Sequence, residues 1–362
     1  MLYPPGVQCG KVRYLMERTH DLRISSLRPL IAPAAMKKEL PMTEASNKTV
    51  IQSRIVINDI LAKKDKRLLA LIGPCSIHDI KAAEEYASRL LKLAEKLKDR
   101  IYIVMRVYFE KPRSTIGWRG LIVDPYLDGS YRIEDGVKLA RRLLLSVTQK
   151  GLPAGSEMLD PIVPQYIDDC ISWASIGART TESQTHRNLA SGLSMPVGFK
   201  NSTSGSIQTA LDALTSAIHP HSFIGIDHNG QTCILDTTGN QAVHLIMRGG
   251  KSGPNYYEEN VEKAEELFRK ASIEPAIMID CSHANSGKKH ERQERVLNAV
   301  LDQRCRGRSS IIGIMLESNL KEGQQDIPRD ISALEYGKSV TDACIGWEKT
   351  EELLNNAYEA LG

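Results

Sequence analysis

The segment LALIGPCSIHD, residues 69–79, joins the end of an apolar, β-prone run to a cysteine and the start of a helix-like stretch. The apolar run stops at Gly73-Pro74, and Cys75 follows directly. A buried cysteine is most often a small apolar filler. Cys75 is therefore a candidate for a chemical role only if reactive side chains occupy equivalent positions after other strands.

Short apolar runs alternate with amphipathic helix-like segments from residue 67 to the end of the chain. Eight evenly spaced strand–helix units predict a (β/α)8 TIM barrel. An open, doubly wound sheet also alternates strands with helices, but seldom in eight such units. The runs are RLLALIGPC (67–75), IYIVMR (101–106), PAGSEML (153–159), SIGART (175–180), PVGFKN (196–201), VHLIMRGG (243–250), AIMIDCSH (276–283) and SIIGIMLES (310–318).

Three segments lie outside this rhythm. Residues 1–15 are expected to be a disordered extension. Residues 16–66 are polar and helix-prone, and predict an N-terminal helical extension before the barrel, 67–362. Residues 221–240 predict an inserted β-hairpin between the fifth helix and the sixth strand, because Asn229-Gly230 is a strong hairpin signal.

Composition excludes several classes of protein. The net charge is +3, without a Lys/Arg block, which argues against a nucleic-acid partner. No 18-residue apolar run suggests a membrane span, and the first residues lack the features of a secretory signal. The seven cysteines are widely spaced, so we expect free thiols in a reducing cytoplasm.

The ends of the eight predicted strands all carry ionisable or metal-competent side chains. In a TIM barrel these ends form the active-site face. The residues are Cys75, Arg106, Glu157, Arg179, Lys200, Arg248, His283 and Glu317.

Two chemistries emerge from this set. The cations at the strand ends are joined by Lys111 and Arg113, in the loop after the second predicted strand. These cations fall into two groups and favour two phosphorylated substrates, at least one of them an acid. Cys75, His283 and Glu317, with Asp342 after the eighth strand, are ligand types for a divalent metal acting as a Lewis acid. The carboxylates favour Mn²⁺ or Fe²⁺, and the thiolate and imidazole also allow Co²⁺, Zn²⁺ or copper.

Several long motifs resemble the class I 3-deoxy-D-arabino-heptulosonate-7-phosphate (DAHP) synthases. The resemblance extends from about residue 20 to the end, with the motifs in the family's order. They are GPCSIHD, MRVYFEKPRSTIGWRG, GARTTESQTHR, PVGFKN, LIMRGGK, IDCSHANS and SVTDACIGW.

The resemblance implies a metal-dependent transferase that condenses phosphoenolpyruvate (PEP) with erythrose 4-phosphate, the first step of the shikimate pathway. It implies Cys75, His283, Glu317 and Asp342 as metal ligands, and Arg113 with Ser114 at the erythrose 4-phosphate site. Lys111 is our candidate proton donor, and Glu157 the candidate that orients water. The implied PEP-binding residues are Arg106, Lys111, Arg179, Lys200 and Arg248.

The family is feedback-inhibited by aromatic amino acids and is usually dimeric or tetrameric, so the resemblance also implies an effector cavity and a homo-oligomer. It further implies a regulatory or oligomerisation role for the extension 16–66. Gly225 favours tyrosine over phenylalanine, because a missing side chain leaves room for the para-hydroxyl. The candidate effector residues are Asp21, Pro164, Ser194, Phe223 and Gly225.

Three alternatives remain open from sequence. A 3-deoxy-octulosonate-8-phosphate synthase uses PEP on a similar barrel, but KPRSTIGWRG and the hairpin argue against it. A catalytically inactive barrel would have lost a ligand or a clamp residue, and none is lost. A metal-free aldolase would use a Schiff-base lysine at a strand end, where Lys200 is the candidate.

Overall fold

The computed structural model describes residues 19–362, and the chain divides into two compact units, Met1–Leu30 and Ile31–Gly362. The extension expected at residues 1–15 lies outside the described residues. Residues 31–66 belong to the same compact unit as the barrel, so the division between units falls earlier than residue 66. Within residues 19–362, no helix has the length and apolar character that crossing a membrane requires.

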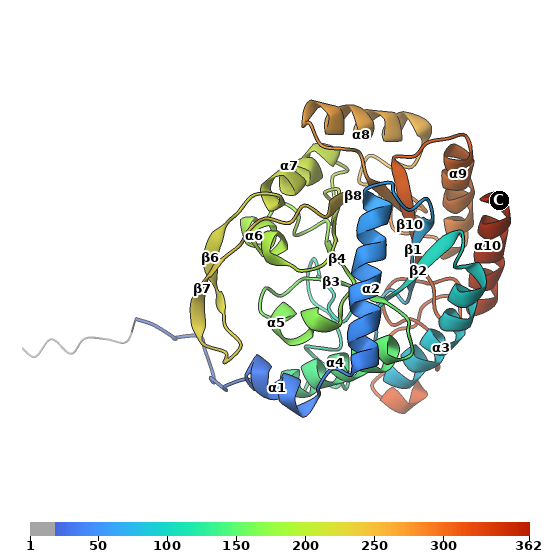
Figure 1. Cartoon of the computed structure of the whole chain (residues 1–362). Helices are drawn as coiled ribbons and strands as arrows, with labels where there is room; N and C mark the ends of the chain where they lie inside the picture. Colours follow the sequence, from blue (N-terminus) through green and yellow to red (C-terminus); the bar gives the residue numbers. More distant parts are fainter. Residues whose placement is uncertain (1–18) are drawn as a thin grey trace, which may run out of the picture. The chain divides into compact units, whose positions relative to one another are not determined.

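Eight parallel strands form a closed barrel in the order β1-β10-β9-β8-β5-β4-β3-β2 (Figure 1). This confirms the predicted TIM barrel and excludes the open sheet. Seven of the predicted apolar runs contain one strand each, whereas the fourth strand begins at Trp173, two residues before the predicted run 175–180. The strands are β1 (Leu68–Gly73), β2 (Ile101–Arg106), β3 (Ala154–Glu157), β4 (Trp173–Ile176), β5 (Val197–Lys200), β8 (Val243–Met247), β9 (Ile277–Asp280) and β10 (Ile311–Glu317).

Helices surround the strands and pack their apolar faces against them. The first barrel helix, α3, begins where the Asp79 carboxylate accepts a hydrogen bond from the backbone N–H of Ala82 at 3.1 Å. The longer helices are α2 (Glu44–Leu61), α3 (Ile80–Leu97), α4 (Ile133–Gln149), α6 (Gln184–Gly192), α7 (Ile207–Ala217), α8 (Glu258–Lys270), α9 (Gln293–Cys305) and α10 (Trp347–Ala360); α1 (Pro33–Glu39) and α5 (Pro164–Ile167) are short.

Alternate residues of β1 serve two cores. Leu68, Ala70 and Ile72 pack in the layer between strands and helices, whereas Leu69 and Leu71 belong to a smaller cluster with side chains from other strands. This alternation is the two-residue period of a strand. Because both faces are buried, the run reads in the sequence as continuously apolar.

Helix α2 packs against the strands through its own apolar side chains and crosses the barrel in Figure 1. Ile57 and Ile60 are buried in the same cluster as Leu69 and Leu71. Burial of each isoleucine contributes roughly 1.5–3 kcal/mol. Helix α2 is therefore an integral part of the fold.

Two strands outside the barrel, β6 (Ser222–Ile226) and β7 (Thr232–Asp236), pair antiparallel between α7 and β8. The turn between them contains Asn229 and Gly230, and Gly230 has a φ of +78°. Ile224 and Ile234 pair across the two strands and are 79% and 73% exposed. The hairpin therefore presents one apolar pair to solvent.

The barrel interior contains a buried histidine, His244, whose ring is neutral. His244 on β8 is fully buried, and its Nε2 accepts a hydrogen bond from Trp173 Nε1 at 3.2 Å. The neutral ring then carries its proton on Nδ1, which has no hydrogen-bond partner among residues 19–362. Burial lowers the pKa of His244 from 6.5 to about 3.

We expect His244 to make the fold acid-sensitive. Between about pH 6.5 and 3 the unfolded state binds a proton that the folded state does not bind, so stability falls as the pH falls through this window. The loss approaches about 1.4 kcal/mol per pH unit. Urea unfolding at pH 7, 6 and 5 should show a smaller pH dependence for His244→Gln than for the wild type. His219→Gln, at an exposed position, is the control, and equal pH dependence in all three proteins would contradict the assignment.

Candidate active site

A cavity of about 700 Å³ opens at the carboxyl ends of the barrel strands. Its lining unites side chains that are far apart in the sequence and that sequence analysis placed at one face. The predicted residues that line it are Arg106, Lys111, Arg113, Ser114, Glu157, Arg179, Lys200, Arg248, His283 and Asp342. Cys75 and Glu317, the remaining two, contact this lining from behind.

Cys75, Glu317 and Asp342 form a compact group of metal-donor atoms. One donor atom from each lies within 4.8 Å of the other two. The Cys75 Sγ is 3.6 Å from Asp342 Oδ2. Without a metal, burial raises the pKa of the Cys75 thiol to about 11, and Glu317 adds to this shift. Metal binding there has to displace the thiol proton.

Gly73 allows the neighbouring strand to approach Cys75 closely. A Cβ at Gly73 would lie 2.5 Å from the backbone oxygen of Arg106. This close approach brings the Arg106 guanidinium to the Gly-Pro-Cys segment, where Nε donates to Pro74 O at 3.1 Å and Nη2 to Cys75 O at 3.3 Å. The Gly-Pro before Cys75 is thus part of the site's architecture.

Arg106 and Glu317 form a buried ion pair, with 2.7 Å between Nη2 and Oε1. Their side chains are 1% and 2% exposed, so neither charge is hydrated. Burial by itself would lower the pKa of Arg106, but Glu317 and other neighbouring groups raise it above the usual value. Breaking such a pair leaves an uncompensated charge in the interior, which is strongly destabilising.

Lys111 lies directly beside the thiol. Its Nζ is 3.1 Å from Cys75 Sγ and 3.2 Å from Cys75 O. Burial disfavours its charge, yet the surrounding Cys75, Glu317 and Asp342 raise its pKa above the usual value. Lys111 is therefore a protonated amine next to the donor group.

His283 presents one ring nitrogen toward this group and uses the other for support. Its Nδ1 lies 2.9 Å from Asp280 Oδ2 and 2.7 Å from Ser282 Oγ, and its Nε2 lies 3.8 Å from Glu317 Oε1. The backbone at His283 has a φ of +56°, a conformation that is concentrated at functional sites. His283 adjoins the three-residue group without belonging to it.

Asp280 was missed by the sequence analysis. It ends β9 and holds both His283 and Lys200, whose Nζ is 3.2 Å from Asp280 Oδ2. Although burial raises its pKa, His283 and Lys200 hold the pKa well below the usual value. A charged residue closing the apolar run IMID was the available signal. A carboxylate behind a ligating histidine is a common support of metal sites.

Three lining arginines have no acidic partner. Within residues 19–362, no carboxylate forms an ion pair with Arg113, Arg179 or Arg248. Lys251 and Lys288 also line the cavity, and sequence analysis did not assign them. An excess of unpaired cations in one cavity favours anionic ligands.

Two buried carboxyl groups, those of Glu157 and Glu110, lie near one another. Glu157 is 9% exposed and lines the cavity, and its Oε1 has no hydrogen-bond partner in the described part of the chain. Glu110, also missed by sequence analysis, is 5% exposed and accepts a hydrogen bond from Asp160 N at 3.4 Å. Burial, with Asp160 and Glu157 nearby, raises the pKa of Glu110 to about 7.

A second cavity of about 560 Å³ contains most of the candidate effector residues. Pro164, Ser194 and Phe223 line it, together with Leu235 of the hairpin. Gly225 is not part of the lining, because Leu235 covers it: a Cβ at Gly225 would lie 2.4 Å from Leu235 Cδ1. Asp21 belongs to the unit Met1–Leu30.

Comparison with known proteins decides the family. The family model described as the DAHP synthetase I family matches residues 41–355. The chain belongs to this family. Members condense PEP with erythrose 4-phosphate in the first step of the shikimate pathway, and the chain is such an enzyme. The octulosonate synthase, inactive-barrel and Schiff-base alternatives are therefore set aside.

Individual relatives agree with this assignment. The chain is 50% identical over 342 residues to the Tyr-sensitive phospho-2-dehydro-3-deoxyheptonate aldolase of Salmonella typhimurium, covering 94% of this chain and 96% of the relative. It is 52% identical over 341 residues to the Phe-sensitive enzyme of Escherichia coli, covering 94% and 97%. A solved structure of the aldolase from Francisella tularensis superposes with a TM-score of 0.91 at 47% identity, covering 93% and 98%.

We expect Asp280→Asn to weaken metal binding while leaving every candidate ligand in place. The neutral amide supports the His283 ring less well, and such changes raise the dissociation constant about 10- to 100-fold. Competition between the protein and a fluorescent chelator for Mn²⁺ measures this constant. Asp302→Asn, on the exposed side of α9, is the control. Wild-type Mn²⁺ affinity in Asp280→Asn would show that this carboxylate does not support the site.

Proposed function

We propose that the strand-end cavity is where the family's condensation occurs in this chain, with a metal and two phosphate groups bound by its own residues. The observation that carries this proposal is the combination within one cavity of unpaired arginines and a compact cluster of metal donors. Either feature alone has a structural explanation, but together they match a reaction between two anionic substrates that needs a Lewis acid.

The donor set fits a divalent metal, which Cys75, His283, Glu317 and Asp342 would hold. When bound, the metal would polarise the aldehyde carbonyl of erythrose 4-phosphate. Two carboxylates in the set favour Mn²⁺, and Fe²⁺, Co²⁺ and Zn²⁺ also suit it. His283 Nε2 is available because Nδ1 is occupied by Asp280 and Ser282.

In this proposal, different cations bind the two substrates. Arg179, Lys200 and Arg248 bind the phosphate of PEP, whereas Arg113 and Ser114 bind the phosphate of erythrose 4-phosphate. Arg106 donates its remaining N–H to the carboxylate of PEP. Four of its contacts go to Pro74, Met315, Cys75 and Glu317, and a guanidinium has five N–H donors.

Lys111 is the proton donor to the oxygen that becomes the new hydroxyl. C3 of PEP attacks the aldehyde carbon, C2 becomes electron-deficient, and Lys111 Nζ supplies the proton to the aldehyde oxygen. Glu157, whose Oε1 has no partner within the described residues, orients water for attack on C2 and accepts its proton. Loss of inorganic phosphate from the resulting hemiketal phosphate completes the reaction.

Replacement of Lys111 by methionine should reduce kcat by about 10²–10⁴-fold. The KM for PEP should change little, because the phosphate-binding cations remain. Steady-state kinetics that follow PEP disappearance measure both constants. Lys289→Met, at an exposed lysine outside the cavity lining, is the control. Parallel losses in kcat and PEP affinity would make Lys111 a binding residue.

We further propose that the second cavity binds an aromatic amino acid, with tyrosine favoured. Support comes from its lining by Pro164, Ser194 and Phe223 and from the regulated names of two relatives. Asp21, in the unit Met1–Leu30, stays a prediction from the sequence. Gly225 acts through Leu235: the missing side chain allows Leu235 to fold back against the strand, which keeps the cavity deep enough for a para-hydroxyl.

Gly225→Ser should weaken tyrosine binding by about tenfold relative to phenylalanine, because the new side chain displaces Leu235 toward the cavity. Calorimetric titration of the full chain with each amino acid measures the ratio. Gln231→Ser, exposed at the hairpin turn, is the control. Tighter phenylalanine binding by the unchanged protein would refute the choice of tyrosine.

The chain is also proposed to form a cytoplasmic homodimer or homotetramer. The six described cysteines are all free thiols, which suits a reducing compartment. The exposed Ile224–Ile234 pair on the hairpin is an apolar surface that a second copy would bury. Residues 16–66 are proposed to have a regulatory or oligomerisation role. A monomeric mass by light scattering would overturn this part of the proposal.

A further inference from the structure

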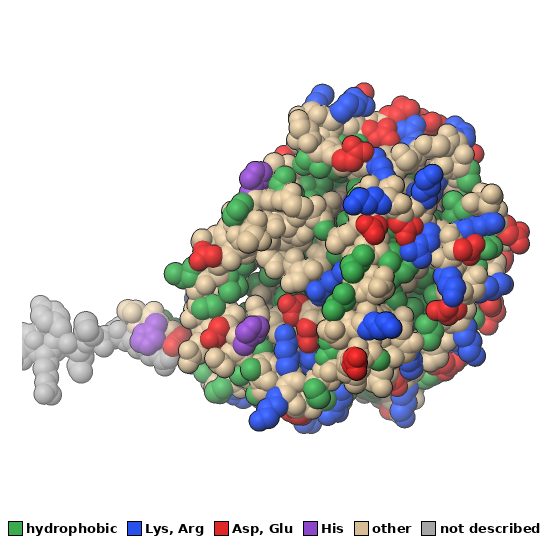
Figure 2. Space-filling view, in the orientation of Figure 1, with side chains coloured by type: hydrophobic (Ala, Val, Ile, Leu, Met, Phe, Trp, Pro, Cys, Tyr) green, Lys and Arg blue, Asp and Glu red, His purple; other side chains and the backbone are tan. Residues whose placement is uncertain are grey.

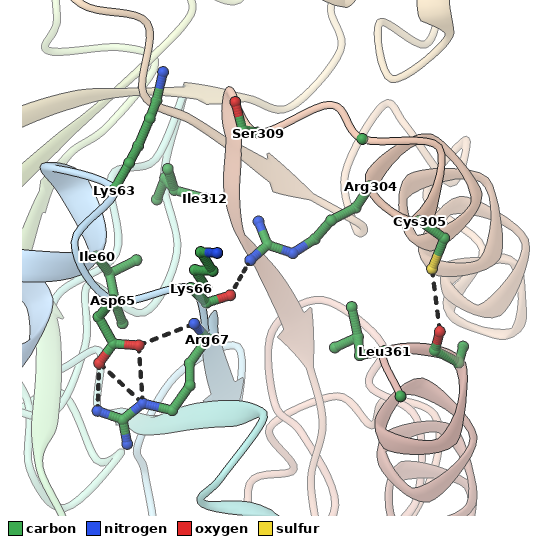
Figure 3. A pocket seen from close by; sticks show the side chains of 13 residues that line it. Ile60, Lys63, Asp65, Lys66, Arg67, Arg304, Cys305, Ser309, Ile312 and Leu361 are labelled. Atoms are coloured by element: carbon green, nitrogen blue, oxygen red, sulfur yellow. Dashed lines mark hydrogen bonds and ion pairs between the residues drawn. The ribbon is translucent and has the colours of Figure 1, made fainter.

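A cavity of about 500 Å³ that does not share any lining residue with the active site is formed by three chain segments: the loop between α2 and β1, the connection from α9 to β10, and the end of α10 (Figure 3). Apart from residues 360–362 at the end of α10, its lining residues precede β1 or β10 or, in the case of Ile312, lie at the start of β10. The cavity therefore belongs to the amino-terminal end of the barrel, opposite the catalytic face. Figure 2 shows Lys and Arg side chains gathered around the carboxyl end of α2.

Two cations in the cavity wall have no acidic partner within residues 19–362. Lys63 pairs with Glu274, and Arg67 pairs with Asp65. In contrast, Lys66 forms no ion pair, and the Arg304 guanidinium donates to two backbone oxygens, those of Lys66 and Ile311. These bonds place the Arg304 charge at the Lys66 backbone (Figure 3).

The position of Arg304 is energetically unusual. Its burial lowers the pKa of the guanidinium, and no carboxylate offsets this effect. The two carbonyl contacts explain how Arg304 links the two segments of chain. They do not explain why a second unpaired cation, Lys66, lines the same space. An anion between these two groups would stabilise both charges.

Besides the paired Lys63, Asp65 and Arg67, part of the wall is apolar. Ile60, Ile312 and Leu361 line the cavity beside the two cations. A bare inorganic ion has no apolar part to pack against this surface, whereas an organic anion buries its hydrocarbon part there. Cys305 also lines the cavity, and its Sγ donates to Ala360 O at 3.2 Å.

We propose that this cavity binds a small organic anion, whose carboxylate or phosphate group contacts Lys66 and Arg304 and whose apolar body packs on Ile312 and Leu361. The site is a second ligand site, separate from the catalytic cavity and from the proposed effector cavity, with which it shares no lining residue. An occupant would bridge the α2–β1 loop and the end of α10.

Cys305 provides a local readout of occupancy. It is the exposed thiol among the described cysteines, the others being buried or half-buried. Alkylation of the full chain by iodoacetamide, followed by mass spectrometry of the Cys305 peptide, reports on this cavity regardless of ligands elsewhere. The probes are benzoate, phenyl phosphate and the neutral analogue benzamide, compared at constant ionic strength.

We expect an anionic probe at twice its dissociation constant to slow alkylation of Cys305 about threefold, and benzamide to have no such effect. Protection by benzoate alone assigns a carboxylate ligand, by phenyl phosphate alone a phosphate ligand, and by both a site selective for charge only; each outcome supports the proposal. Absence of protection by either anion, or equal protection by benzamide, would overturn it.

Lys66→Glu tests the charge at a side chain whose ammonium forms no hydrogen bond or ion pair within residues 19–362, since only the backbone oxygen of Lys66 is bonded there. This variant should lose the protection that the anions give. Lys64→Glu makes the same charge change at an exposed position of the same loop and outside the lining, and should retain it. Retained protection in Lys66→Glu would show that any anion effect arises elsewhere.

Discussion

The buried ion pair between Arg106 and Glu317 links the catalytic end of the barrel across its first strand. β1 lies between β2 and β10, and the pair joins the last residues of those two outer strands at the level of Cys75. This contact requires Gly73, because a side chain there would collide with the Arg106 backbone. Since the pair is almost fully buried, its geometry is tightly constrained, and the positions of Cys75 and Lys111 follow from it.

The cations of the barrel differ in whether a carboxylate pairs with them. Arg106 and Lys200 lie deep in the barrel, and each is matched by a carboxylate, Glu317 or Asp280. Arg179 and Arg248 have no such partner and line the open part of the cavity. The same distinction applies at the opposite end, where Arg67 is paired and Arg304 is not. Charge that the fold leaves uncompensated is charge that a ligand can use.

The two ends of the barrel have different roles because α2 packs into one of them. Its isoleucines share a core with β1 and neighbouring strands, so the N-terminal segment from residue 31 onward is part of the domain. The carboxyl ends of the strands remain open and carry the residues that line the strand-end cavity. The hairpin between α7 and β8 adds the wall of a separate cavity without interrupting the parallel sheet.

The sequence by itself determined the barrel and most of the catalytic face. Eight apolar runs, spaced by amphipathic helices, specify eight strands, and a parallel barrel places whatever follows each strand at one end. Cys75, Lys200 and Glu317 could therefore be assigned together before any contact was known. Local periodicity carries this information, because it depends only on residues near one another in the chain.

Only the tertiary structure decided the contacts between distant segments. Asp280 behind His283, Glu110 beside Glu157, and Leu235 over Gly225 each depend on side chains from separate elements meeting at a particular distance. The cavity around Lys66 and Arg304 depends on three segments whose separation in the sequence conceals their proximity. Side-chain packing in three dimensions sets these distances, and one-dimensional periodicity does not encode them.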